Sequence, residues 1–125
     1  MSAEAVAFSA LSGAAPVTAV VGTKIYPDLV PAERPLPAIA AFRVETRPLN
    51  TIHGGVPIGY DVALEIWCMA ETRLEANEIA ELCRDPLTAA QFVIIGQRSD
   101  MVPVPEGEEG DGILASVVTA EYFET

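Results

Sequence analysis

The sequence predicts an α+β domain: a mostly antiparallel sheet of about four to five strands, with two helices packed on one face. Two observations lead to this class. Segments with the period-two alternation of half-buried strands follow one another in runs, and only two long segments have apolar residues at helical spacing. Such runs are typical of antiparallel sheets with helices segregated to one face. The expected order is α–β–β–β–α–β–β, in a single domain of residues 1–125.

The clearest element boundary is a strand-to-helix joint between residues 60 and 83. Residues 60–70 alternate as a strand, and the residues after them have helical spacing. Thr72 precedes Glu75 by three positions, which is the spacing of a capping box at the start of a helix. The pair Asp85-Pro86 is expected to end this helix, since a proline disfavours helical backbone in the residue before it.

The two faces of the strand at residues 60–70 differ in composition. One face is an uninterrupted apolar row and should pack against the helices. The other combines charge with a large aromatic, so we expect it to be half exposed or to lie at a subunit contact, where Trp and Met are enriched. The apolar row is Val62, Leu64, Ile66 and Cys68, and the mixed row is Ala63, Glu65, Trp67 and Met69. The residues expected to be buried on the following helix are Leu74, Ala76, Ile79, Ala80 and Cys83.

Shorter patterns predict the remaining elements. A helix over residues 3–11 would be capped by Ser2 and ended by Gly13, with Ala5, Val6, Phe8 and Leu11 as its apolar residues. Residues 17–21 suit a further helical turn, because Pro16 fits the first position of a helix. Pro48 is expected to end the strand that begins at residue 38. The other predicted strands cover residues 24–26, 38–47, 92–97 and 113–123.

Residues 49–59 are predicted to be a glycine-rich connector between two antiparallel strands, and this connector carries apolar side chains. Apolar residues on a projecting loop of a monomer have nothing to cover them. Either they fold back onto the sheet, or the loop contacts another protein, and we favour the contact. Its candidate contact residues are Leu49, Ile52, His53, Val56 and Ile58.

The charge balance argues against sequence-specific binding of nucleic acid. The chain has 18 acidic and 7 basic residues, for a formal net charge of −11, and such a surface repels phosphate backbones. Solubility is the simplest explanation of this charge. A surface along which DNA slides without binding is also compatible with it. Half of the residues are hydrophobic, which either an alanine-rich helix or a surface covered by identical subunits would explain.

No residue pattern indicates catalysis, a cofactor or a metal. Cys68 and Cys83 lie in predicted regular elements on core faces, where thiols act as small hydrophobic side chains. A structural zinc site needs about four ligands, and His53 stands among glycines without an acidic or thiol neighbour at ligand spacing. No phosphate-binding glycine loop, nucleophile elbow or dinucleotide motif is present. We therefore predict that the chain is not an enzyme.

One acidic loop resembles a cation site only superficially. It lacks the ligand pattern of an EF-hand and the bidentate Glu at that loop's twelfth position. A solvated acidic turn is the favoured interpretation, with weak cation binding left open. The acidic residues are Glu106, Glu108, Glu109 and Asp111.

Targeting signals are not evident either. Residues 1–22 lack a basic start and include Glu4, unlike a secretory signal peptide. No apolar run reaches the ~18 residues that a membrane span needs. We expect a cytosolic site of synthesis and no membrane partner.

Several short motifs in order resemble one known family. After the first helix comes Pro16-Val17-Thr18-Ala19-Val20-Val21-Gly22, then Lys24-Ile25-Tyr26-Pro27, and Pro35-Leu36-Pro37-Ala38-Ile39 leads a strand. The last motif is Trp67-Cys68-Met69-Ala70, which runs into a helix with Glu75-Ala76 and Ile79-Ala80. Together these resemble the tail completion, or tail terminator, family of tailed bacteriophages and phage-like particles. The resemblance covers almost the full chain and is loosest after Asp85.

The resemblance implies a structural virion protein from a phage, a prophage or a gene transfer agent. Its subunits would form a ring, commonly a hexamer, that caps the tail tube and docks the tail to the head-completion or connector proteins in the neck. DNA would pass through the lumen as non-specific cargo, and assembly would take place in the host cytoplasm. In that setting, Glu65, Trp67 and Met69 become candidates for the subunit interface. Residues 49–59 would contact the tube or neck, and the acidic loop at residues 106–112 would line the lumen.

Three other functions remain open from the sequence. The chain is compatible with another head-completion or connector subunit of the neck. It is also compatible with a small cytosolic enzyme or ligand-binding α+β domain, although that needs a polar constellation in a pocket. The third is an α+β adaptor for an unknown partner.

Overall fold

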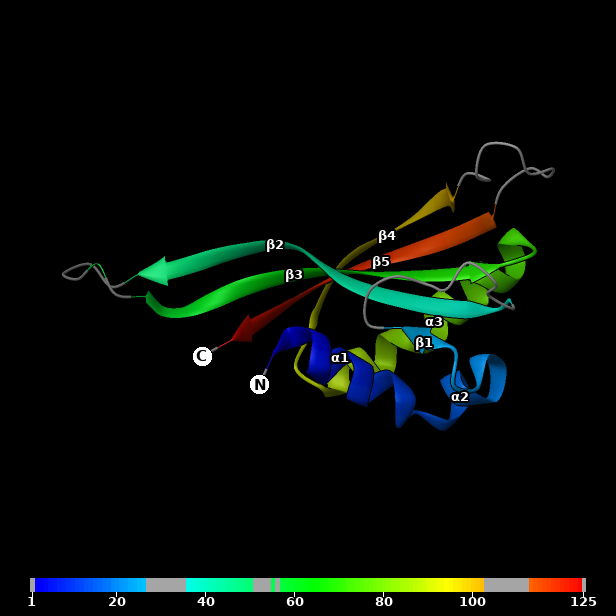
Figure 1. Cartoon of the computed structure of the whole chain (residues 1–125), viewed down its shortest axis with the longest axis horizontal. Coiled ribbons are helices and arrows are strands. Elements are labelled where there is room, and N and C mark those ends of the chain that lie inside the picture. The colour runs from blue at the N-terminus through cyan, green and yellow to red at the C-terminus, as the bar shows by residue number, and fades with distance from the viewer. Residues whose placement is uncertain (1, 27–35, 51–54, 56, 103–112, 125) are drawn as a thin grey trace.

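The computed structural model describes residues 2–26, 36–50, 55, 57–102 and 113–124, and all statements about structure refer to these residues. Five strands form one sheet in the order β1-β2-β3-β5-β4, in which β1 and β2 are parallel and all other neighbours antiparallel. The helices lie on one face of this sheet (Figure 1). The elements are α1 (Ala3–Ser12), α2 (Ala15–Val21), β1 (Ile25–Tyr26), β2 (Ala38–Asn50), β3 (Pro57–Ala70), α3 (Arg73–Ala89), β4 (Val93–Val102) and β5 (Ile113–Glu124).

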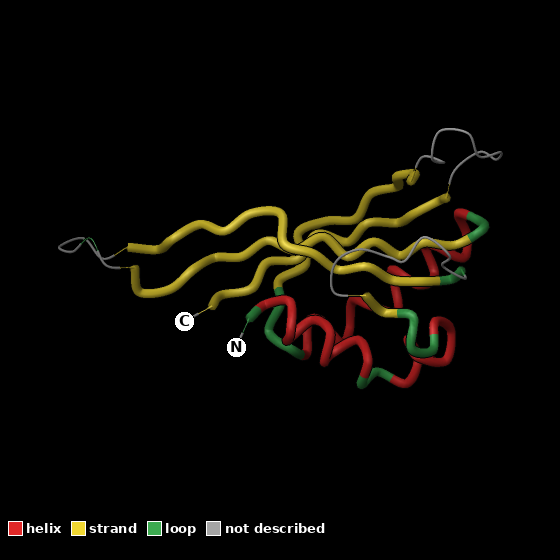
Figure 2. The backbone as a smooth tube through the Cα atoms, in the orientation of Figure 1, coloured by secondary structure: helices red, strands yellow, loops and turns green. Residues whose placement is uncertain are grey.

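The predicted α+β class is confirmed, with three helices in place of two. The segment after Pro16 forms a separate helix, α2, with Pro16 at its start and Gly22 at its end. Gly22 has a φ of 62°, a left-handed conformation that glycine adopts without a Cβ clash. Figure 2 shows the resulting two layers, a twisted sheet and a helical layer below it.

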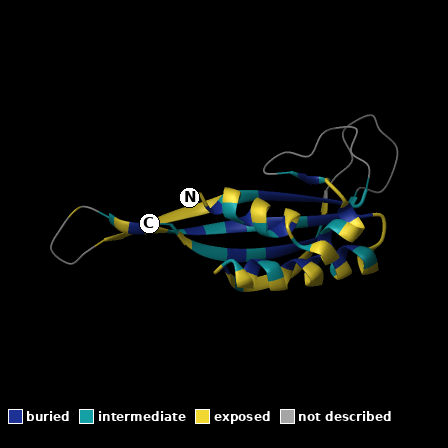
Figure 3. Ribbon diagram, turned by 90° about the horizontal axis from the view of Figure 1, so that it is seen from below, coloured by how far each residue is buried: buried dark blue, intermediate teal, exposed yellow. Residues whose placement is uncertain are grey.

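The main core lies between these layers, and the apolar row of β3 is at its centre. The predicted residues Val62, Leu64, Ile66 and Cys68 are all fully buried against the helices. In Figure 3 the helices are seen from below, with buried positions toward the sheet and exposed ones toward the viewer. Helix α1 packs through Ala3, Ala7 and Leu11, whereas the predicted apolar residues Ala5 and Phe8 are exposed. Its small buried side chains allow a close approach to the core.

Helix α3 begins where the sequence predicts but ends later. Thr72 Oγ1 accepts the backbone N–H of Glu75 at 3.2 Å, which is half of the predicted capping box. Asp85-Pro86 does not end the helix, because Pro86 lies inside it and Leu87 is fully buried. Leu74, predicted to be buried, is 70% exposed. The buried stripe of α3 is therefore shifted toward its C-terminus.

A well-formed cap ends α3 at Ala90 and explains how the chain continues past Pro86. The N–H of Phe92 binds the Leu87 carbonyl at 3.0 Å, and the N–H of Gln91 binds the Thr88 carbonyl at 3.1 Å. Gln91 has a φ of 74°. This is the Schellman pattern, and both Leu87 and Phe92 belong to the core. Tertiary packing thus outweighs the helix-breaking tendency of Pro86.

The hairpin of β2 and β3 is longer than predicted. Pro48 does not end β2, which pairs with β3 from Ala38 to Asn50, and β3 begins at Pro57. Beyond Thr46 and Val62 this hairpin extends past the helical layer, on the side where the chain termini lie (Figure 1). We call residues 47–50 with 57–61 the arm.

None of the described helices is by itself long and apolar enough to cross a membrane. Helices α1 and α2 reach the required length and composition only together, as a pair bent by 82°.

Candidate functional site

The first candidate surface is centred on Trp67, on the sheet face opposite the helices. The Trp67 ring stacks on Phe42 of β2, with 6.3 Å between ring centroids. From β4, the Arg98 guanidinium lies 5.9 Å from the centroid of the Trp67 ring, within the range of a cation–π contact. This part of the surface therefore combines an aromatic pair with a cation above it.

Glu65 connects the members of this cluster. Its Oε1 accepts the indole N–H of Trp67 at 3.1 Å, and its Oε2 accepts an N–H of Arg98 at 3.0 Å. Asp100 adds a weaker ion pair to Arg98 at 3.5 Å. The hydrogen bond from Arg98 and that from Trp67 hold the pKa of Glu65 below its usual range, against the opposing effect of burial. The carboxylate is thus ionised at neutral pH and fixes the orientation of both partners.

The three predicted interface residues share this face but differ in exposure. Glu65 and Trp67 are partly exposed, whereas Met69 is 3% exposed within its own chain. Met69 packs with Ala40 and Ala115, flanked by Leu36, Trp67 and Ile113. Of the three, only Glu65 and Trp67 therefore expose side-chain surface, and Met69 packs beneath them within its own chain.

The arm is the second candidate surface. Of the predicted contact residues, Leu49 and Ile58 lie in its strands and are 41% and 59% exposed. Ile52, His53 and Val56 lie outside the described residues, as do Glu106, Glu108, Glu109 and Asp111 of the acidic loop. At the base of the arm, Arg47 forms ion pairs with Asp61 at 2.8 Å and Glu121 at 3.2 Å.

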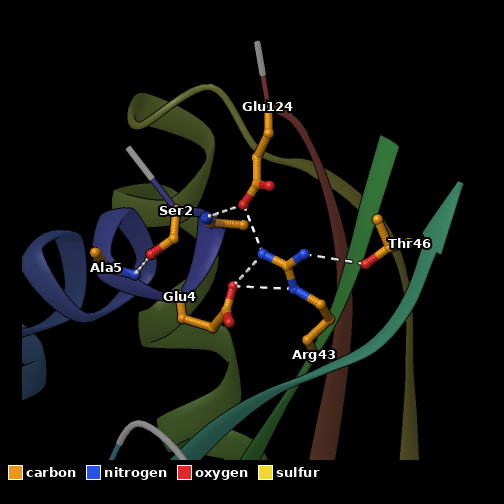
Figure 4. A network of polar contacts seen from close by, with 7 residues as sticks. Ser2, Glu4, Ala5, Arg43, Thr46 and Glu124 are labelled. Atoms are coloured by element: carbon orange, nitrogen blue, oxygen red, sulfur yellow. Dashed lines mark hydrogen bonds and ion pairs between the residues drawn. The ribbon is translucent and has the colours of Figure 1, made fainter. Parts of the chain in front are cut away.

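A third polar cluster joins the two ends of the chain, and we call it the clasp (Figure 4). The Arg43 guanidinium binds Glu4 Oε1 at 2.6 Å and Glu124 Oε2 at 2.7 Å. Glu124 Oε2 also accepts the backbone N–H of Ala3 at 2.5 Å, and Arg43 donates to Thr46 Oγ1 at 3.1 Å. The clasp holds α1, β2 and β5 together. It has no reactive group and is structural.

The clasp is not among the sites predicted above, although the sequence contains a signal for it. Arg43 alternates with Ile39 and Ala41, so a cation stands on the row of β2 that faces the helices. A charge in such a position requires a partner on the element that covers it. That partner is Glu4, in the first turn of α1. Burial opposes ionisation of Glu4, but hydrogen bonds from Arg43 and from its own backbone, with the charge of Arg43, lower its pKa.

We expect Arg43→Met to lower the free energy of unfolding by about 1–2 kcal/mol at neutral pH. Hydrogen bonds to charged groups contribute roughly 1.5–3 kcal/mol, and the partial exposure of Arg43 and Glu4 reduces this. The pKa of Glu4 is lowered on folding. The contribution of the Arg43–Glu4 pair to the free energy of unfolding is therefore fully present above the unfolded pKa of this carboxyl and is lost as pH falls through its folded pKa. Urea unfolding of both proteins over this pH range measures the difference.

Arg47→Met is the matched control, since Arg47 is 55% exposed and its ion pairs are on the surface. It should change stability by at most about 0.5 kcal/mol. If Arg43→Met lowers the free energy of unfolding by the same amount at neutral pH and well below the ordinary carboxyl pKa, the clasp does not stabilise the fold electrostatically.

The two cysteines are in contact but are not arranged for catalysis. Their Sγ atoms are 3.9 Å apart, and both side chains are fully buried. The contact with Cys83 and burial raise the pKa of the Cys68 thiol well above its ordinary value, which disfavours the reactive thiolate. Among the described residues, no group of three or more His, Cys, Asp or Glu side chains could hold a metal ion.

An open groove of about 530 Å³ lies between the end of α3 and the start of β4. Its lining mixes charged and apolar side chains. The lining residues are Glu81, Arg84, Asp85, Thr88, Phe92, Val93 and Ile94. The shape suits part of another protein better than an enclosed small molecule.

Comparison with known proteins identifies a family. The sequence model of the family described as Tail completion protein gp17 matches residues 6–108, which include every described helix and strand except β5 and the start of α1. No curated protein has significant sequence similarity to the chain.

Proposed function

This chain belongs to the family of tail completion protein gp17, and from that membership we propose that it forms the ring that ends the tail tube and joins the tail to the head. A role in phage tail completion, as a virion component, follows from the family itself. The proposal adds a closed ring of six subunits at the neck. Its protein partners are the tube protein below and the head-completion or connector proteins above. Assembly takes place in the host cytoplasm.

The family match over residues 6–108 is the observation that carries this proposal. The charge supports it. A formal charge of −11 on each subunit gives a ring a strongly negative wall, along which DNA moves without being held. DNA is then cargo in the lumen and not a specific ligand. We assign the acidic loop at residues 106–112 to the lumen wall.

Two surfaces are proposed for protein contacts. The cluster of Glu65, Trp67 and Arg98 offers an ordered aromatic and a cation at the surface, which are residue types enriched at the centres of interfaces. The arm presents Leu49 and Ile58 to solvent beyond the helical layer, and we assign residues 49–59 to contact with the tube or the neck.

Membership of a structural family also suggests that the chain is not an enzyme. Another position in the neck, as a head-completion subunit, remains the alternative and shares the ring symmetry. The two roles differ in the partner of the ring. A tail terminator binds the end of an isolated tail, whereas a head-completion subunit is found on heads.

Electron microscopy of tails tests the proposed function. In the phage or prophage that encodes the chain, isolated tails should carry a ring at the head-proximal end, and antibody against the chain should bind there. Tails made without the chain should fail to join heads, and adding the purified chain should restore joining. Normal joining in its absence would contradict the proposal, and labelling of heads instead of tails would favour the alternative.

Trp67→Ala should weaken the ring more than the fold. Truncation of an interface aromatic costs about 2 kcal/mol or more, so the concentration at which rings dissociate should rise at least about 30-fold. Native mass spectrometry over a dilution series measures this, with urea unfolding as the test of the fold. Phe8→Ala removes an exposed aromatic from α1 and is the control. An unchanged ring in Trp67→Ala would show that Trp67 is not at the interface.

A further inference from the structure

Strand β4 is an open edge of the sheet. Among the described residues it pairs only with β5, and its ten residues include neither proline nor lysine, the usual protections of an exposed edge. Its two charged side chains, Arg98 and Asp100, bind each other and the Trp67 cluster. Val93 and Ile95 are 62% and 55% exposed. An edge of this kind is a template for another strand.

Within the described residues, the opposite edge of the same sheet is also open over most of its length. There β1 pairs with Ile39 and Ala40 of β2, and from Ala41 to Asn50 β2 has β3 as its only described partner. A register shift between Arg43 and Glu45 makes Val44 a bulge residue. Pro48 has no N–H to donate, which leaves residues 41–43 and 45–47, on either side of this bulge, as the parts of the edge that can form a ladder.

The two edges have compatible directions and lengths. Each of the pairs β2–β3, β3–β5 and β5–β4 is antiparallel, so β2 and β4 run in opposite directions. If a second subunit is related to the first by rotation about an axis close to the strand direction, its β2 keeps its direction. This β2 then runs antiparallel to β4 of the first subunit when the two strands lie side by side. The register shift at Ile95 leaves β4 regular from Gly96 onward, and its residues 96–101 match in number the six residues 41–43 and 45–47 of β2.

The charges on the two edges are also complementary. If Gly96 lies opposite Arg47, then Arg98 lies opposite Glu45. Beyond the bulge at Val44 the pairing resumes with Ser99 opposite Arg43, and residues that lie opposite each other share the same face of the sheet. The side chains of Arg98 and Glu45 point to the face opposite the helices, since their strand partners Val117 and Ala63 do so. Glu45 is 58% exposed and has one ion pair, to Arg47 at 3.5 Å. In the same register Arg47 faces a glycine and meets no like charge.

We propose that β4 of one subunit pairs edge to edge with β2 of a second copy, residues 96–98 against 45–47 and residues 99–101 against 41–43, so that the sheet continues from subunit to subunit. This inference deepens the proposed ring and depends on it. The contact is heterologous, because two different edges meet, and such contacts close into rings. The neighbour's arm then lies beside the groove between α3 and β4, where Phe92, Val93 and Ile94 offer apolar surface.

Paired cysteines test the contact in the full chain. Gly96 and Arg47 are exposed and lie opposite each other in this register, and neither belongs to the clasp or to the Trp67 cluster. A Cβ at Gly96 meets no atom within 4 Å, so a side chain fits there. The double variant Gly96→Cys/Arg47→Cys, treated with a short bis-maleimide in assembled tails, should give a ladder of linked chains. The buried native thiols of Cys68 and Cys83 should not react.

The single variants separate this arrangement from its alternatives. Each alone should give no linked product. A linked dimer from a further single variant, Ser99→Cys in the middle of β4, would indicate that two β4 edges meet around a two-fold axis, which overturns the proposal. Absence of a ladder from the double variant also overturns it. If microscopy still shows a ring on those tails, only the edge pairing fails, and if no ring is present, the proposed function fails with it.

Discussion

Leu87→Ala should lower the free energy of unfolding by about 2–5 kcal/mol, the range for large-to-small substitutions in a packed core. Leu87 is fully buried although it follows Pro86, and its carbonyl accepts the N–H of Phe92 at 3.0 Å in the cap of α3. Truncation removes core contacts at the point where the end of α3 meets β4. Urea unfolding followed by circular dichroism measures the loss.

Leu74→Ala is the matched control on the same helix. The sequence pattern predicts Leu74 to be buried, whereas in the structure it is 70% exposed. Its truncation should change stability by no more than about 0.5 kcal/mol, as is usual for surface positions. If Leu74→Ala costs more than Leu87→Ala, the helix ends at Asp85 after all and its buried stripe is the one the sequence predicts.

The fold class could be predicted because its main signals are local. The alternation in β3 and the capping spacing of Thr72 and Glu75 depend on neighbours along the chain, and both are confirmed. The number of helices is harder to predict from the sequence, since α2 has only seven residues and no side-chain cap. A short apolar run of this kind has no clear period, so only Pro16 and Gly22 indicated a helix.

Both errors at prolines have the same physical origin. Pro48 and Pro86 were predicted to end their elements, on the basis of a lost N–H and restricted backbone angles. At Pro48, β2 has a described partner on one side only, so an N–H directed to the other side is not needed. At Pro86, one helical hydrogen bond is lost, but burial of Leu87 and the Schellman cap compensate. Neither compensation is visible in the sequence near the proline.

The candidate surfaces were predictable in position but not in detail. The mixed face of β3 indicated Trp67, but the contribution of Arg98 comes from β4, 31 residues later, and depends on strand order. Burial of Met69 depends on Ala40 and Ala115 from two other strands. The clasp likewise joins Glu4 to Glu124 through Arg43. Contacts at such sequence separations are set by the topology of the sheet.

Gly59→Ala should destabilise the protein by about 2–3 kcal/mol, toward the upper end of what overpacking costs. Gly59 is a buried position of β3, and a Cβ there would meet the ring of Phe123 and lie 2.7 Å from the Glu124 carbonyl oxygen. The ring can move, since Phe123 is 45% exposed, but the carbonyl belongs to the backbone of β5. The strand must therefore shift, and it carries the Glu124 carboxylate that binds Arg43 and Ala3 in the clasp.

The same substitution at Gly96 is the control for loss of a strand glycine. A Cβ at Gly96 would meet no atom within 4 Å, so Gly96→Ala should change stability by about 0.5 kcal/mol or less. The double variant Gly59→Ala/Phe123→Ala separates the two causes. If the double variant is as stable as Phe123→Ala alone, the destabilisation by Gly59→Ala comes from the Phe123 ring, which contradicts a backbone clash. Partial recovery, together with a weaker pH dependence of stability near the carboxyl pKa, would show that the shift of β5 reaches the clasp.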